Sequence, residues 1–314
     1  MERYKQKATN MKNKMILGQI KMAAFTSLGV LAFASLALAD DTTSGHSGLE
    51  TMEQPQVGQM LQINPGFTYI GEADFHNDSL GDISVWRVDV PVRYTIKTEP
   101  GDLRLGAFYE YSEYDTSDLS GTEKFNTLSF DVLWKSMLND NWGYFLYGAV
   151  GCSAAKDTGL GTGLTGIGGG GVQYVWSENL SLGLGAAVAT HMEDDPSVLP
   201  IIALNWQIND RWNLRTLNGA TITYDVSGDK SFLVDLSARF QQREYRTDSD
   251  TSLRDRMVTV ELGATYNFSR HFGLRGFAGV AAGRSIQRRF KGDKAGDKDV
   301  DPAPIVGVRA FMTF

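Results

Sequence analysis

The chain has 314 residues, of which 42% are hydrophobic, 11% aromatic and 21% charged, and its formal net charge is -7. This composition excludes a collagen and a wholly disordered chain, and the acidic balance argues against nucleic acid as a partner. The single cysteine, Cys152, excludes an internal disulfide and a metal cluster built from cysteines.

The first 39 residues are typical of a secretory signal peptide. Residues 1–21 are basic, residues 22–38 are apolar and carry no charge, and Ala37-Leu38-Ala39 provides the small residues of a cleavage site. We predict cleavage after Ala39; the alternative is an uncleaved anchor, because the apolar run approaches the roughly 18 residues that could span a bilayer. Residues 40–57 are polar and acidic without a period, which predicts a flexible periplasmic leader.

From residue 60 to the end, apolar and polar side chains alternate along the chain. Residues 83–97 show the pattern most clearly, since Trp86 and Val88 share one face while Arg87 and Asp89 share the other. Each such run is about the 9 to 11 residues that a tilted membrane-spanning strand needs, and none has the spacing of an amphipathic helix. The same pattern recurs in residues 103–111, 127–135, 232–243 and 258–268.

Short turns alternate with longer polar segments between these runs. The short turns are residues 98–102, 139–141, 177–179, 209–211, 227–230 and 269–271, and the long segments are residues 72–82, 115–124, 154–162, 191–197, 246–254 and 288–302. Transmembrane barrels show this asymmetry, with their short turns in the periplasm. Because both chain ends would be periplasmic, the strand number must be even. It is about 14 if residues 212–217 and 221–226 form a short hairpin, and about 12 if that segment folds inward.

The last segment, residues 303–314, alternates up to its final residue, the aromatic Phe314. It resembles the closing strand of bacterial outer-membrane β-barrels, a porin-like superfamily in which a terminal Phe is read by the insertion machinery. The resemblance implies that Phe314 is the membrane insertion signal and that the partners are outer-membrane lipid and the barrel-insertion machinery. An open sheet edge in lipid would leave backbone groups unpaired. We therefore predict an all-β fold over residues 58–314, a closed antiparallel transmembrane β-barrel in the outer membrane.

Many charged side chains occupy the polar face of the predicted strands. A charge facing lipid near the bilayer midplane costs about 2 to 4 kcal/mol, so these residues would line the lumen. The predicted lumen-lining residues are Arg87, Asp89, Arg93, Arg104, Glu110, Asp131, Lys135, Asp235, Arg239, Arg243, Glu261, Arg275 and Arg309.

An arginine-rich wall favours anionic or polar solutes, and a barrel of about 12 to 14 strands lies between filled and open barrels. We therefore predict a monomeric passive pore for small polar solutes. The first alternative is a structural or surface-interaction barrel without transport, in which charges of both signs crosslink the lumen. The second is an outer-membrane lipid-modifying enzyme.

Other motifs carry less information. The run from Gly161 to Gly166 matches a dinucleotide-binding pattern, but another alternating strand follows it where that pattern requires a helix. His191, beside Asp194 and Asp195, is the best catalytic candidate, yet the sequence places no nucleophile or water beside it. The acidic loops lack the spacing of a calcium-binding loop. We predict no catalytic residue, no cofactor and no metal site, and hence a protein that is not an enzyme.

Overall fold

The computed structural model describes residues 58–76, 81–99, 101–117, 122–216, 219–290 and 293–314. The predicted signal peptide, its cleavage site and the leader lie outside these ranges. Within them, the one helical segment is the 3-10 turn η3 (Leu160–Gly163), and no helix is long and apolar enough to cross a membrane. The strands are β1 (Gly58–Ile63), β2 (Gly66–Asp74), β3 (Asp82–Thr98), β4 (Gly101–Thr116), β5 (Glu123–Met137), β6 (Trp142–Ala155), β7 (Leu164–Ser177), β8 (Leu180–Ala189), β9 (Ser197–Gln207), β10 (Trp212–Arg215), β11 (Ala220–Asp225), β12 (Phe232–Asp248), β13 (Thr251–Asn267), β14 (Phe272–Phe290), β15 (Asp293–Val300) and β16 (Ala303–Thr313).

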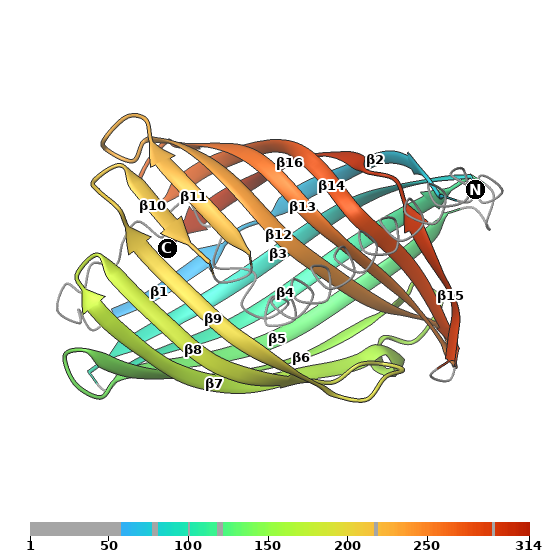
Figure 1. Ribbon diagram of the computed structural model, residues 1–314, viewed down its shortest axis with the longest axis horizontal. Coiled ribbons are helices and arrows are strands. Elements are labelled where there is room, and N and C mark those ends of the chain that lie inside the picture. Colours follow the sequence, from blue (N-terminus) through green and yellow to red (C-terminus); the bar gives the residue numbers. More distant parts are fainter. Residues whose placement is uncertain (1–57, 77–80, 100, 118–121, 217–218, 291–292) are drawn as a thin grey trace, which may run out of the picture.

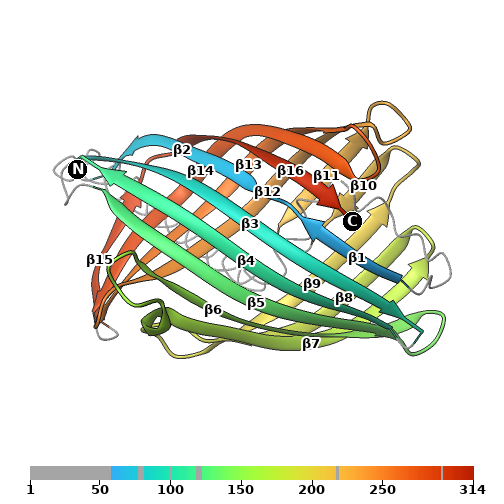
Figure 2. The same ribbon diagram turned by 180° about the vertical axis from the view of Figure 1, so that it is seen from behind.

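The sheet closes on itself. Consecutive strands pair antiparallel from β2 to β14, and β16 pairs with β14 on one side and with β1 and β2 on the other. Two wall strands are interrupted near a proline, which lacks the backbone N–H that the ladder needs: β1 and β2 both lie along β3, and β15 and β16 both lie along β14. With each interrupted strand counted once, the wall is a closed barrel of 14 strands (Figures 1 and 2). The prediction of about 14 strands is confirmed and the alternative of 12 is wrong.

The outer surface is apolar over the middle of the wall. Large aliphatic and aromatic side chains there are 41 to 60% exposed, the reverse of a water-soluble core: Phe67, Leu105, Phe130, Leu146, Leu184, Ile202, Leu236, Leu262, Val280 and Val306. Exposed aromatic residues follow near the short turns, as in an interfacial girdle: Trp142, Trp176, Trp206, Trp212, Tyr266, Phe268 and Phe272. This belt is what a barrel surrounded by lipid requires.

The predicted hairpin of residues 212–226 is present as β10 and β11, and it is short. β10 pairs with β9 only at residues 205–207, and β11 pairs with β12 only at residues 233–238. Beyond the hairpin, toward the end of the barrel opposite the short turns, no pairing among the described residues joins β9 to β12. The two strands lie apart there in Figure 1. Instead, Arg246 near the end of β12 forms a parallel bridge with Ala154 of β6. The wall is therefore interrupted between the first part of β9, before residue 205, and the last part of β12, after residue 238.

Two of the predicted long loops are wrong. Residues 246–254 and 288–302 largely continue the ladders of β12 with β13 and of β14 with β15. Arginines of these segments pair with Glu244 of β12 and with the connection between β8 and β9, so the sheet extends beyond the apolar belt. Polarity marks the end of the membrane-spanning part, and it does not mark the end of a strand.

Candidate functional site

On the inner wall, ion pairs join strands that are two positions apart and pass over a glycine of the strand between them. Asp89 on β3 binds Arg309 on β16, with Nη2 at 3.0 Å from Oδ1, although β2 lies between these strands. Gly66 on β2 stands opposite both residues, and a Cβ there would lie 2.9 Å from the Arg309 guanidinium carbon. A side chain at this position would therefore push the arginine away from its carboxylate.

The same arrangement recurs on the neighbouring strands of the wall, since Arg275 of β14 stands directly opposite Arg309 in the ladder. Asp235 on β12 binds Arg275 on β14 at 2.7 and 3.0 Å, and the pair passes over Gly263 of β13. A Cβ on Gly263 would lie 2.5 Å from Arg275 Nη2 and 2.7 Å from Asp235 Oδ1. These glycines provide the space in which guanidinium and carboxylate meet in the plane of the lumen wall.

Between these pairs lies a cavity of about 70 Å³ lined by five arginines: Arg87, Arg239, Arg243, Arg275 and Arg309. The carboxylates of Asp89 and Glu261 also line it. Each arginine except Arg239 has a carboxylate within 3.1 Å. Arg239 Nη1 lies 3.9 Å from Glu261, which is itself shared with Arg275 at 3.7 Å. Among the described residues, Nε and Nη2 of Arg239 make no hydrogen bond.

A polar layer crosses the lumen between this cavity and the end of the barrel that lies opposite the short turns. Asp255 of β13 accepts hydrogen bonds from Arg87 at 3.1 Å, from Arg284 at 3.0 and 3.1 Å, and from the Tyr114 hydroxyl at 2.9 Å. Glu110 of β4 accepts three hydrogen bonds from Arg243 at 2.9 to 3.2 Å. These contacts tie β3 and β4 to β12, β13 and β14 across the barrel.

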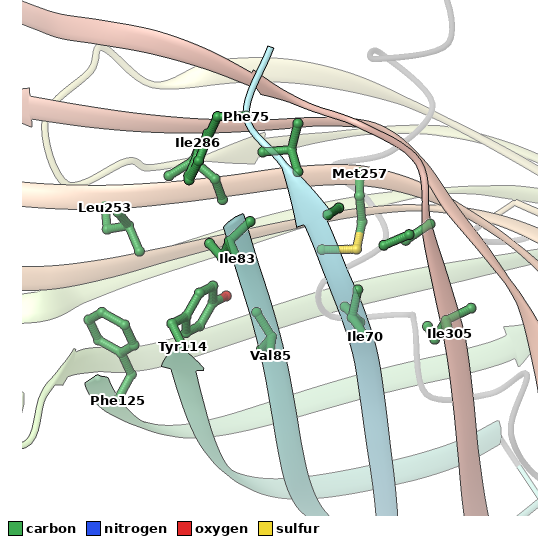
Figure 3. Packing of buried hydrophobic residues seen from close by; sticks show 14 of the residues in the cluster. Ile70, Phe75, Ile83, Val85, Tyr114, Phe125, Leu253, Met257, Ile286 and Ile305 are labelled. Atoms are coloured by element: carbon green, nitrogen blue, oxygen red, sulfur yellow. The ribbon is translucent and has the colours of Figure 1, made fainter. Parts of the chain in front are cut away.

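An aromatic cluster accompanies the layer. The rings of Tyr114, Phe125 and Tyr245 pack with centroid separations of 4.3 to 5.8 Å. They belong to a buried apolar core that also includes Ile83 and Met257 (Figure 3). This core and the charged layer lie between β2–β5 and β12–β16, in the half of the barrel opposite the short turns.

The other predicted lumen residues lie on β3, β4 and β5, nearer the short turns. Arg93 is buried, whereas Arg104, Asp131 and Lys135 are half-buried. Arg93 and Asp131 both stand opposite Gly106, where a Cβ would overlap the Asp131 carboxylate. Phe314, the predicted insertion signal, closes the ladder through two backbone hydrogen bonds with Leu61, and its side chain is 68% exposed.

Polar residues also cover the outward face of β12, β13 and β14 at the end of the barrel opposite the short turns. There Glu244, Arg254 and Arg289 face the connection between β8 and β9: Arg254 binds Asp194 at 2.7 Å, and Arg289 also binds Asp194. For His191 the sequence suggested Asp194 or Asp195 as a partner, and the structure places Ser197 and Glu244 beside its ring. Its Nε2 lies 2.9 Å from Ser197 Oγ and its Nδ1 lies 3.7 Å from Glu244.

Several residues of these clusters escaped prediction from the sequence. Tyr114 directly precedes one segment whose polarity suggested a loop, and Asp255 directly follows another. Arg284 lies within the β-bulge at which the register of β14 against β13 shifts. The weak signal for Asp255 was its place in the alternating pattern that leads into β13.

A family model described as a domain of unknown function, DUF6268, matches residues 84–295. The chain belongs to this family. No curated protein matches the chain. The closed wall and apolar belt confirm the resemblance to bacterial outer-membrane β-barrels, so this DUF6268 member is an outer-membrane protein.

Several solved structures are similar to the DUF6268 chain. The Pseudomonas putida toluene transporter TodX is 9% identical with a TM-score of 0.45, over 83% of this chain and 91% of that one. An outer membrane channel from Pseudomonas putida F1 is 11% identical with a TM-score of 0.45, over 84% and 98%. A Pseudomonas aeruginosa FadL homologue is 9% identical with a TM-score of 0.43, over 83% and 93%.

Proposed function

We propose that the protein is an outer-membrane channel for small solutes that carry a negative charge. The observation that supports this proposal is the arginine-lined cavity, in which Arg239 has hydrogen-bond donors without acceptors among the described residues. A guanidinium matches the geometry of carboxylate and phosphate groups, and rings of arginine select anions in pores. The predicted class of small polar solutes is thereby narrowed to anions.

The charges around the cavity favour an anion there. Arg243, Arg275 and Arg309 each pair with a carboxylate within 2.9 Å, and Arg87 shares Asp255 with Arg284. Arg239 has only the more distant Glu261, which it shares with Arg275. The Arg239 side chain is 13% exposed, so water compensates its charge poorly. A passing anion would accept the free hydrogen bonds and add the missing negative charge.

A second candidate function, transport of apolar solutes, is favoured by a different part of the wall. Leu133, Phe145, Tyr147, Ala187 and Ile201 form an apolar cluster on the inner face of β5 to β9. Ile201 lies on the part of β9 that has no described partner toward β12. An apolar solute would follow this face and leave through the interrupted wall into the bilayer.

Single-channel recording of the refolded protein in planar bilayers tests the first function. We expect a current whose reversal potential in a salt gradient shows preference for anions, and a smaller preference in Arg239→Gln. Arg211→Gln, in an exposed periplasmic turn, is the matched control and should keep the wild-type preference. A cation-selective current would refute the anion proposal, and no current above the bare bilayer would favour a barrel without transport. If Ile201→Glu lost the uptake of a lipophilic dye while Arg239→Gln kept it, the second function would be favoured.

A further inference from the structure

Four side chains form a continuous polar relay at the extracellular end of the barrel. Arg254 Nη2 donates to Glu244 Oε1 at 2.9 Å, and Glu244 Oε2 faces His191 Nδ1 at 3.7 Å. His191 Nε2 lies 2.9 Å from Ser197 Oγ. The two ring nitrogens of the histidine thus face a carboxylate and a hydroxyl respectively, which is the order of groups in a serine hydrolase triad.

We propose that Ser197, His191 and Glu244 form a hydrolytic site for carboxylic esters that carry an apolar acyl chain. His191 would act as general base, Ser197 as nucleophile, and Glu244 as the group that holds the imidazole in one tautomer and stabilises the imidazolium. Arg254 is a positioning residue, since it binds the Glu244 oxygen that faces away from the histidine.

The reaction balances with water as the co-reactant. Ser197 Oγ attacks the ester carbonyl carbon while its proton passes to His191 Nε2. The tetrahedral intermediate collapses, the bond to the alcohol oxygen breaks, and the alcohol leaves with the proton from Nε2. Water then attacks the acyl-serine with the same histidine as base, which releases the carboxylic acid and restores the Ser197 hydroxyl.

The site is held by contacts that do not use its reacting atoms. Arg246 binds Glu193, and Asp194 binds both Arg254 and Arg289, so the connection between β8 and β9 is fastened to the sheet two and three residues after His191. The side chains of His191 and Glu244 are each 8% exposed, whereas Ser197 is half-buried and reachable. The ion pairs alone would hold this connection in place. That structural role does not require a histidine between a hydroxyl and a carboxylate.

The position of Ser197 supports the choice of an apolar ester. It is the first residue of β9, and the next residue, Val198, is 71% exposed on the outer surface. A strand rises about 3.3 Å per residue, so the nucleophile lies close to the upper edge of the apolar belt. The interrupted wall between β9 and β12 begins on this same strand. An acyl chain can lie along the apolar wall while its ester group reaches the serine.

The experiment uses the refolded full-length barrel in detergent micelles. A fluorophosphonate probe should label Ser197, identified by peptide mass spectrometry, and the protein should hydrolyse p-nitrophenyl esters, with octanoate preferred to acetate. Ser197→Ala should abolish labelling, and His191→Gln should lower hydrolysis about 10² to 10⁴-fold. Glu244→Asp should retain more activity than Glu244→Gln, because a carboxylate still faces the ring.

The controls separate catalysis from folding and from transport. Glu193→Gln removes a charge from the Arg246–Glu193 ion pair and alters none of the three reacting groups, so Ser197 should still be labelled. Heat-modified migration on gels should show that Ser197→Ala is folded, and its single-channel current should equal that of the wild type. Equal hydrolysis by wild type and Ser197→Ala, or absence of label on Ser197 in the folded protein, would overturn the proposal.

Discussion

The substitution Asp255→Asn tests whether the charged layer holds the two sides of the barrel together. Asp255 accepts four hydrogen bonds, from Arg87, Arg284 and Tyr114, and both Asp255 and Arg284 have fully buried side chains. Breaking a buried ion pair by removing one partner costs about 3 to 5 kcal/mol. Asparagine keeps one acceptor oxygen but removes the charge that two guanidinium groups share. We therefore expect a loss of about 3 kcal/mol in the free energy of unfolding.

Urea unfolding in detergent micelles, followed by tryptophan fluorescence, measures this loss as a lower midpoint at unchanged slope. Asp140→Asn, an exposed acid in the short turn between β5 and β6, is the matched control and should leave the midpoint unchanged. Adding Arg284→Met to Asp255→Asn should cost less than the sum of the two single changes, since the groups are in contact. A free energy of unfolding of Asp255→Asn within about 0.5 kcal/mol of the wild-type value would refute the reasoning, because surface changes alone produce shifts of that size.

Three further predictions concern glycines and the last residue. Gly263→Ala should destabilise the barrel by about 1 to 3 kcal/mol in urea, because its Cβ overlaps the Asp235–Arg275 pair, whereas Gly276→Ala, with open space around its Cβ, should not. Gly219→Ala should weaken the β10–β11 hairpin by about 1 to 3 kcal/mol, because φ is 127° there; faster backbone hydrogen exchange in β11 is the check. Phe314→Ala should refold normally in detergent, because that residue bonds Leu61 through its backbone, but should yield less folded barrel in cells; equal yields would contradict its role as an insertion signal.

The architecture could be predicted because it follows from local chemistry. Alternation of side chains fixes which face of each strand meets lipid, and short turns fix the antiparallel order. Even the hairpin around Gly219, which decided between 12 and 14 strands, is visible in the sequence as a turn between two short alternating runs. The interruption of the wall above it was not visible, because it depends on the different lengths of β9, β11 and β12.

The contacts across the lumen could not be predicted for a different reason. Glu110 and Arg243 are 133 positions apart, and Arg87 and Asp255 are 168 apart. Their meeting depends on how closely β3 and β4 approach β12 and β13 across the lumen. Alternation says only that such side chains face inward. Likewise, Ser197 and Glu244 carry no recognisable spacing, and only the fold brings His191 between them.

The two proposed sites lie on opposite faces of one strand, so they can be tested separately. Arg239 and Arg243 point into the lumen, whereas Glu244 points to the outward face and toward His191. β12 therefore separates the cavity from the relay. We expect Arg239→Gln to change ion preference and leave ester hydrolysis intact, and Ser197→Ala to do the reverse. If either substitution altered both measurements in the folded protein, the two sites would communicate through β12, and the assignment of separate roles to its two faces would be wrong.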